Sequence, residues 1–210
     1  MGWSIILFDF NTNIFLQMKK LIIILILFVN LQSWTKADDV KDFQIEGISI
    51  GDSILDHFSN EFINREKTFP YKNKKYFGLY KELTNSQYEA LQVTVNSNYI
   101  VHNFSGKIYY DDNISECYKN MDLIEKELNN LFSNTENRKL TRKHRADPTG
   151  KSTIKDISYF LNNGDAVQIS CTDWSKYTDP DTGKIWNSMD ELKVSIYSSA
   201  FINFLNNENY

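Results

Sequence analysis

The sequence holds few of the residues from which reactive sites are usually assembled. It has only two cysteines and three histidines among 210 residues. No Cys-x-x-Cys pair is present, which argues against a redox-catalytic dithiol. No grouping of histidines and cysteines has the spacing of zinc ligands. The sequence therefore predicts neither a metal site nor a bound cofactor.

Glycine and proline are also scarce, with eight and three residues, and the glycine motifs do not match functional loops. Gly150-Lys151-Ser152 matches the last three residues of the phosphate-binding loop motif, but Arg145 occupies the position of the first glycine in that motif. Residues 47–51, Gly-Ile-Ser-Ile-Gly, match the Gly-x-Ser-x-Gly motif of a nucleophile elbow. That motif places its serine at a strand-to-helix turn, whereas the helix here is predicted to begin only after the second glycine. Neither stretch is interpreted as a catalytic loop.

Long apolar runs are absent apart from Leu21 to Val29, and a membrane-spanning helix needs roughly 20 such residues. Lys19 and Lys20 precede this run, and Thr35-Lys36-Ala37 follows it with small residues at both ends. This layout is typical of a secretory signal peptide. We predict a leader over residues 1–37, with the signal proper at 18–37, cleavage near Ala37, and a periplasmic or secreted protein. Retention of the segment as an uncleaved anchor is the alternative.

The mature chain, residues 38–210, has a suitable length for a single domain. Removing the leader removes three lysines and one aspartate, so the count of 23 basic and 27 acidic residues becomes 20 and 26, and the net charge changes from −4 to −6. An acidic domain is not a general nucleic-acid binder. No integral membrane span is predicted in the mature chain, and its oligomeric state stays unassigned.

Hydrophobic periodicity predicts an α+β fold, an antiparallel sheet with two main helices packed on one face. The order of elements, a helix and a meander in each half, raises the further hypothesis of a pseudo-repeat. The expected helices cover residues 53–62, 113–132 and the C-terminal tail, with caps at Ser53 and Asn113. The expected strands lie at residues 43–50, 76–80, 91–95, 100–110 and 191–199, with a hairpin turning at Asn163-Gly164 and a polar connection over 133–152.

The two cysteines are both predicted to point into the core between helix and sheet. Cys117 is in register with Met121 on the apolar face of the long helix, and Cys171 alternates with Val167 and Ile169 on a strand. In an exported protein this placement favours a disulfide that closes a loop of about 54 residues, worth roughly 4 kcal/mol in the chain-entropy model. Two unpaired core thiols are the alternative.

Three stretches carry a resemblance. "DFQIEGISIGDSILDHFS", "HRADPTGKS" and "CTDWS" resemble segments of an uncharacterised family of small exported proteins from AT-rich marine bacteria, over most of the mature chain. That family implies no activity and no site residues. "ISIGDSILDHF" is similar to the opening of BamE-like outer-membrane assembly lipoproteins, although no lipidation cysteine follows the signal here. This second similarity implies only an analogy of fold.

The leading hypothesis for function is an exported, non-catalytic binding module of the cell envelope. Residues 138–145, "RKLTRKHR", concentrate positive charge that could contact an envelope protein or an anionic envelope component, or form a solvated loop. The alternative is a periplasmic hydrolase-type enzyme whose site is assembled only in the fold. Its weak catalytic candidates are His144, Asp147, Lys151 and Asp173.

Overall fold

The computed structural model describes residues 40–71, 73–147, 149–178, 183, 185–186 and 188–207. These residues belong to one unit of the chain, Thr35–Tyr210. The predicted leader and its cleavage site lie outside the described residues. No helix in the described ranges is long and apolar enough to cross a membrane.

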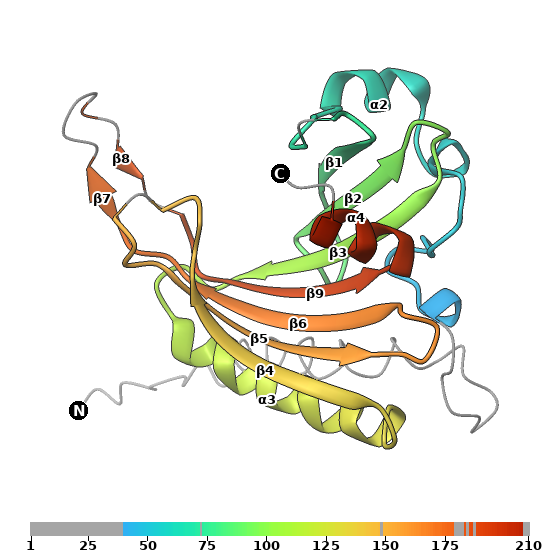
Figure 1. Ribbon diagram of the computed structural model, residues 1–210. Coiled ribbons are helices and arrows are strands. Elements are labelled where there is room, and N and C mark those ends of the chain that lie inside the picture. Colours follow the sequence, from blue (N-terminus) through green and yellow to red (C-terminus); the bar gives the residue numbers. More distant parts are fainter. Residues whose placement is uncertain are drawn as a thin grey trace, which may run out of the picture. The chain divides into compact units, whose positions relative to one another are not determined.

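A seven-stranded antiparallel sheet forms the centre of the fold, in the order β1-β2-β3-β9-β6-β5-β4 (Figure 1). Its strands are β1 (Tyr76–Glu82), β2 (Ala90–Asn96), β3 (Val101–Tyr109), β4 (Glu136–Lys143), β5 (Thr153–Phe160), β6 (Ala166–Asp173) and β9 (Glu191–Tyr197). β7 (Tyr177–Thr178) and β8 (Ile185–Trp186) pair as a separate short hairpin. The α-helices of the described residues are α2 (Asn60–Glu66), α3 (Ile114–Leu131) and α4 (Ser199–Asn207), and two short 3-10 helices, η1 (Val40–Asp42) and η2 (Ile54–Asp56), precede them. The predicted α+β class is confirmed.

The two halves of the chain follow the same order. In the first half, α2 precedes the meander β1-β2-β3, and in the second half α3 precedes β4-β5-β6, which β9 completes. The last strands of the two meanders, β3 and β9, pair with each other at the centre of the sheet. This order is the one that the helix-plus-meander hypothesis predicts.

One face of the sheet is apolar and packs against α3. Alternate residues of β6 and β9 are buried there, including Ile169, Val194 and Ile196. They meet the buried side of α3, which begins at the predicted Asn113 cap. Cys117 of α3 and Cys171 of β6 form a disulfide with their Cα atoms 6.0 Å apart. The predicted pairing is therefore confirmed.

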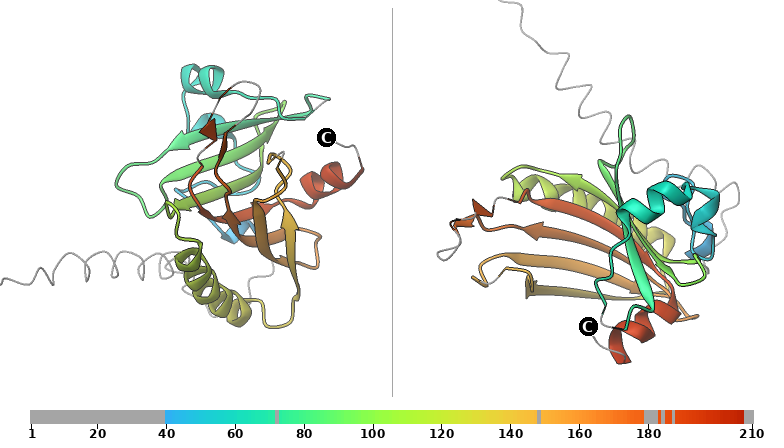
Figure 2. Two further views of the ribbon diagram at one scale, coloured as in Figure 1. Left: turned by 90° about the vertical axis from the view of Figure 1, so that its left-hand side faces the viewer. Right: turned by 90° about the horizontal axis from the view of Figure 1, so that it is seen from above.

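α4 lies on the opposite face of the sheet from α3 (Figure 2). The alternation of β9 shows why, because Ile196 points toward α3 and the next residue, Tyr197, points away. Phe201 and Phe204 of α4 pack with Tyr76 and Tyr197 on that other face. The terminal helix expected from the sequence is thus present and covers one end of the second face.

The segment before α2 differs from its prediction. Residues 43–50 do not form a strand but a tight turn with a bridge between Ile45 and Ile48, because Glu46 and Gly47 both have positive φ. The helix predicted over 53–62 is divided into a single 3-10 turn at Ile54–Asp56, which follows Ser53, and α2, which starts at Asn60. Its cap is Ser59, whose hydroxyl accepts from the Phe62 amide, whereas Ser53 makes no side-chain capping bond.

The prediction of a polar connection over residues 133–152 is wrong for the first half of that range. Residues Glu136–Lys143 form β4, an edge strand whose every residue is exposed. Period-two patterning arises when one face of a strand is buried, and β4 buries neither face, so the sequence carried no such signal. The hairpin at Asn163-Gly164 is confirmed. Only Gly164 takes positive φ, because Leu161 and Asp165 close a loop longer than two residues.

The disulfide is expected to contribute much of the stability of this domain. Replacing Cys117 and Cys171 together by alanine should lower the free energy of unfolding by about 4 kcal/mol, because the 54-residue loop is then open in the unfolded chain. Urea denaturation of the variant and of the wild type measures the difference. The wild type with reductant should match the variant, and equal midpoints for oxidised wild type and variant would contradict the expectation.

His102 should make stability fall in mild acid. Its Nε2 accepts from the Asn96 amide (3.1 Å), so its Nδ1–H donates to Ser198 Oγ (2.9 Å), which accepts from the Phe201 N–H at the start of α4. Burial, with help from the charge of Lys75, lowers the pKa of His102 below its ordinary value of 6.5.

The unfolded chain therefore takes up a proton near pH 6.5 while the folded imidazole stays neutral to lower pH. The contribution of neutral His102 to stability is full above pH 6.5 and declines below it. The free energy of unfolding should fall more steeply between about pH 7 and about pH 5.5 in the wild type than in His102→Gln. Parallel pH profiles for the two proteins would count against this assignment.

Candidate functional site

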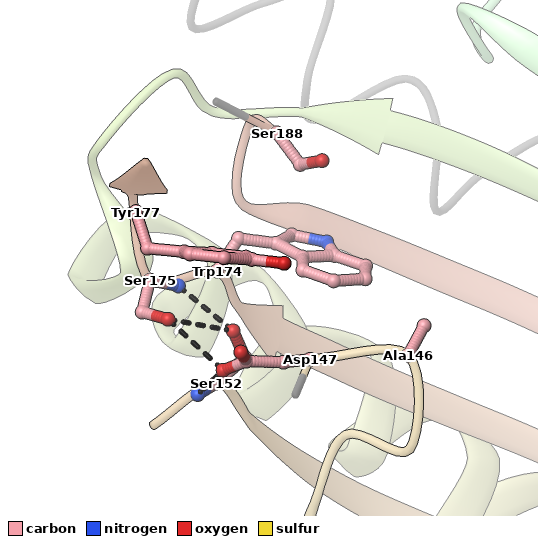
Figure 3. Close-up of a pocket in the computed structure, with 7 residues that line it drawn as sticks. All are labelled: Ala146, Asp147, Ser152, Trp174, Ser175, Tyr177 and Ser188. Atoms are coloured by element: carbon pink, nitrogen blue, oxygen red, sulfur yellow. Dashed lines mark hydrogen bonds between the residues drawn. The ribbon is translucent and has the colours of Figure 1, made fainter. Parts of the chain in front are cut away.

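The loop between β4 and β5 is organised around the carboxylate of Asp147 (Figure 3). Its Oδ1 accepts from the amide (2.8 Å) and hydroxyl (2.7 Å) of Thr149. Its Oδ2 accepts from the amides of Lys151 (3.0 Å) and Ser152 (2.6 Å) and from the hydroxyl of Ser175 (3.0 Å). Five donors on one carboxylate fill its acceptor positions.

These hydrogen bonds, first of all the one from the Ser152 amide, hold the pKa of Asp147 well below its usual range. A carboxylate that is ionised and fully hydrogen-bonded is a poor proton acceptor at neutral pH. Asp147 therefore serves as the structural centre of its turn, where Gly150 supplies the positive φ of 65°.

A small pocket lies beside this carboxylate. It is lined by Ala146, Asp147, Ser152, Trp174, Ser175, Tyr177 and Ser188, and it has a volume of about 10 Å³ (Figure 3). That volume holds about one water molecule. The pocket has no room for an organic substrate.

His144 begins the same loop, directly after β4. Its ring packs on Trp174 with centroids 4.1 Å apart, and its Nδ1 accepts from the Ala146 amide at 3.1 Å. Burial lowers the pKa of His144, while Glu191 acts in the opposite direction and Arg142 adds to the lowering. The lowered pKa favours the neutral imidazole, which lies within the electrostatic reach of charged groups on β4 and β9.

Of the other three candidates only Asp147 lies beside His144, where its amide donates to the His144 carbonyl (3.2 Å) and its charge acts against the lowering of the His144 pKa. Asp173 follows Thr172 in β6 and shares the face of Cys171, toward α3. In agreement, its charge helps burial to raise the pKa of Tyr118 on α3. The Lys151 side chain is exposed, and its amide, not its ammonium group, bonds to Asp147. The four candidates thus do not form one catalytic group.

The face of the sheet opposite α3 carries an array of polar side chains, called the polar face below. One row crosses five adjacent strands, and strand register places its members side by side: Ser158, Gln168, Ser195, Ser105 and Gln92. Ser105 Oγ donates to Ser195 Oγ (2.9 Å), and Gln168 Nε2 donates to Ser158 Oγ (2.9 Å). The three serines are buried, while Gln168 is half-buried and Gln92 exposed. Small hydroxyls thus form a hydrogen-bonded floor between longer side chains.

The adjacent row of the polar face is charged. Register places Asp156, Ser170, Lys193 and Lys107 next to one another on β5, β6, β9 and β3. Lys107 Nζ forms an ion pair with Glu191 Oε2 at 3.0 Å. Lys107 and Lys193 are direct cross-strand partners, and like charges in that position destabilise a sheet.

Lys193 is the unpaired member of this row. It is half-buried, and within the described ranges no carboxylate lies at ion-pair distance from its Nζ, although the charge of Lys193 does act on the nearby Asp156. Asp156 is instead 3.3 Å from Arg142 Nε. Burial raises the pKa of Asp156, against the effect of Arg142, Arg138 and Lys193.

Six charged residues make up the cationic cluster of the polar face: Lys107, Arg138, Arg142, Lys193, Asp156 and Glu191. With Asp156 and Glu191 ionised, four positive and two negative charges leave a local charge of +2, on a chain whose net charge is −4. The sign of this region is opposite to that of the whole protein. Such a region attracts anions.

Two members of the cationic cluster, Arg138 and Arg142, belong to the basic stretch 138–145 that the sequence singled out as a possible contact region, whereas its other four members were not predicted. The alternation of Gln168, Ser170 and Thr172 with apolar residues in β6 was visible in the sequence, as was that of Lys193 and Ser195 in β9. This alternation marks one polar face on each strand. Which polar faces become neighbours depends on strand order, and β9 pairs with β3, more than 80 residues earlier in the chain.

No protein-family model, no curated protein and no solved structure matches this chain. The meaning of the polar face is therefore argued from its own geometry. Among the residues that the structure describes, no group of three or more His, Cys, Asp or Glu side chains could hold a metal ion.

Removing the Lys193 charge should not destabilise the fold. Lys193→Gln relieves the repulsion from Lys107 and should raise the free energy of unfolding by roughly 0.2–1 kcal/mol. Lys126→Gln is the matched control, because Lys126 is exposed on the outer side of α3 and its removal changes the net charge equally. The control should stay within about 0.5 kcal/mol of the wild type in urea denaturation. A clear loss of stability in Lys193→Gln would show that the lysine is a structural residue.

Proposed function

We propose that this protein is an exported, non-catalytic binding module of the cell envelope, and that the polar face is its binding surface. It is periplasmic or secreted after cleavage near Ala37. Its partner is an envelope component that carries negative charge.

The cationic cluster is the observation that supports this proposal most directly. A fold selected for stability alone would not place Lys193 opposite Lys107, because the pair is unfavourable and the lysine has no carboxylate partner in the described part of the chain. Locally unfavourable arrangements of this kind occur where function requires them. A negatively charged partner would relieve the repulsion on binding.

A hydrolase-type enzyme has less support. The Asp147 carboxylate accepts hydrogen bonds from five donors, and the pocket beside it holds about one water molecule. Asp173 lies on the face of the sheet that packs against α3. A general base must reach the proton that it abstracts. No hydrogen bond in the described part of the chain joins the side chains of two of the four candidates, as a nucleophile and its base require.

Two observations support export. The Cys117–Cys171 disulfide is of the kind that persists in oxidising compartments. The sequence of residues 18–37 has the layout of a signal peptide. The resemblance to small exported proteins agrees with both.

The mass of the protein recovered from its own cells should report export and cleavage together. We expect the mass of residues 38–210, lower by two hydrogens before reduction, since the disulfide is closed. Electrospray mass spectrometry with and without reductant and alkylation provides the measurement. A full-length mass with two alkylatable thiols would contradict the proposed location.

Binding through the polar face can be tested without knowing the partner. A photo-crosslinking amino acid is placed at Gln92, which is exposed on the polar face, and, as the matched control, at Lys126 on the far side of α3. Irradiation of intact cells should yield a discrete adduct from position 92 and none from position 126. The same adducts from both positions, or none from position 92, would refute a binding role for this face.

A further inference from the structure

The polar face has a row of charged side chains next to a row of neutral polar side chains, and each row can contact a different kind of ligand group. The cationic cluster offers charge, with Lys193 free of any carboxylate partner among the described residues. The neighbouring row offers neutral amides and hydroxyls from Ser158 to Gln92. A ligand lying across both rows would present an anionic group to the lysine and hydrogen-bonding groups to the amides of Gln168 and Gln92.

The centre of the polar face lacks the features of a protein-binding surface. Protein interfaces usually have an apolar or aromatic centre surrounded by a polar rim. Here the exposed large apolar side chains of the polar face, Tyr80, Leu140 and Phe160, lie on the outer strands β1, β4 and β5. The central strands β9 and β6 carry Lys193 and Gln168 there, while the aromatic side chain of β9, Tyr197, packs against α4 and donates to Gln168.

A hydroxyl-rich ligand suits this centre better than a peptide. The buried hydroxyls of Ser195 and Ser105 bond to each other, so a ligand can reach only the longer side chains of Gln168, Gln92 and Lys193. Gln168 donates to Ser158 Oγ and accepts from the Tyr197 hydroxyl (3.3 Å), which leaves its amide one N–H and one lone pair for a ligand. Amide side chains both donate and accept, as sugar hydroxyls do. An ammonium group donates charge-assisted bonds to a carboxylate or a phosphate.

We propose that the polar face binds an acidic saccharide, a sugar that carries a carboxylate or a phosphate group, with Lys193 contacting the anionic group and Gln168 and Gln92 contacting hydroxyls. This proposal rests on the binding role proposed above and names the chemistry of the ligand. The carboxylate and phosphate forms share the same recognition by Lys193, and separate probes distinguish them.

Calorimetric titration of the mature, oxidised protein tests the proposal with probes of matched structure. A short galacturonate oligomer is compared with a neutral galactose oligomer of the same length, and glucose 6-phosphate is compared with glucose. The acidic member of at least one pair should bind, with its neutral counterpart much weaker. The pair that shows this preference identifies the anionic group as carboxylate or phosphate.

Lys193→Gln then assigns the binding to the polar face. Loss of a charge-assisted hydrogen bond should weaken binding of the acidic probe by about tenfold or more. Gln168→Leu should weaken both acidic and neutral probes, because it removes hydroxyl contacts. Lys126→Gln, which changes the net charge equally, should bind as the wild type does.

Four results would overturn the proposal: no binding of any saccharide, equal binding of acidic and neutral probes, equal weakening in the two lysine variants, or tighter binding of a polyglutamate peptide that depends on Lys193. The last result would assign the surface to an acidic protein. Because the crosslinking experiment at Gln92 detects a partner of any class, a crosslinked adduct without saccharide binding would reject the ligand class and leave the binding role standing.

Discussion

The fold depends on one strand, β9, and on its pairing with both halves of the sheet. One edge of β9 bonds to β3, the last strand of the first meander, and the other edge bonds to β6 of the second. Without it the chain would form two separate small sheets, each with one more open edge. β9 therefore closes contacts between parts of the chain that are far apart in sequence.

The same strand also connects the core to the candidate site. Leu192, Val194 and Ile196 point toward α3 and are buried, while Lys193 and Ser195 alternate with them on the polar face. Because side chains alternate strictly along a strand, fixing the apolar set in the core also fixes the polar set on the other side. The position of Lys193 is thus held by the hydrophobic packing of its neighbours.

The two faces of the sheet have different partners as a result. α3 covers the apolar face and is tied to it by the Cys117–Cys171 disulfide. On the polar face α4 packs only at one end, over Tyr76 and Tyr197. The packing of the apolar face against α3 fixes the strands in place, and the fixed strands keep the like charges of Lys107 and Lys193 close together on the polar face. This arrangement is the physical basis for the recognition role proposed for the polar face and for the structural roles of α3 and Asp147.

The sequence by itself determined the elements whose signal is local. The 3.6-residue period of α3 and its Asn113 cap, the Asn163-Gly164 hairpin and the core register of both cysteines could be predicted, since each depends on residues a few positions apart. Tertiary structure decided the rest. β4 exists only because β5 supplies its hydrogen-bonding partner, and the cationic cluster exists only because β9 lies beside β3 and β6. The sequence encodes which side chains alternate along each strand, whereas the neighbours across strands follow from long-range pairing, which no local pattern records.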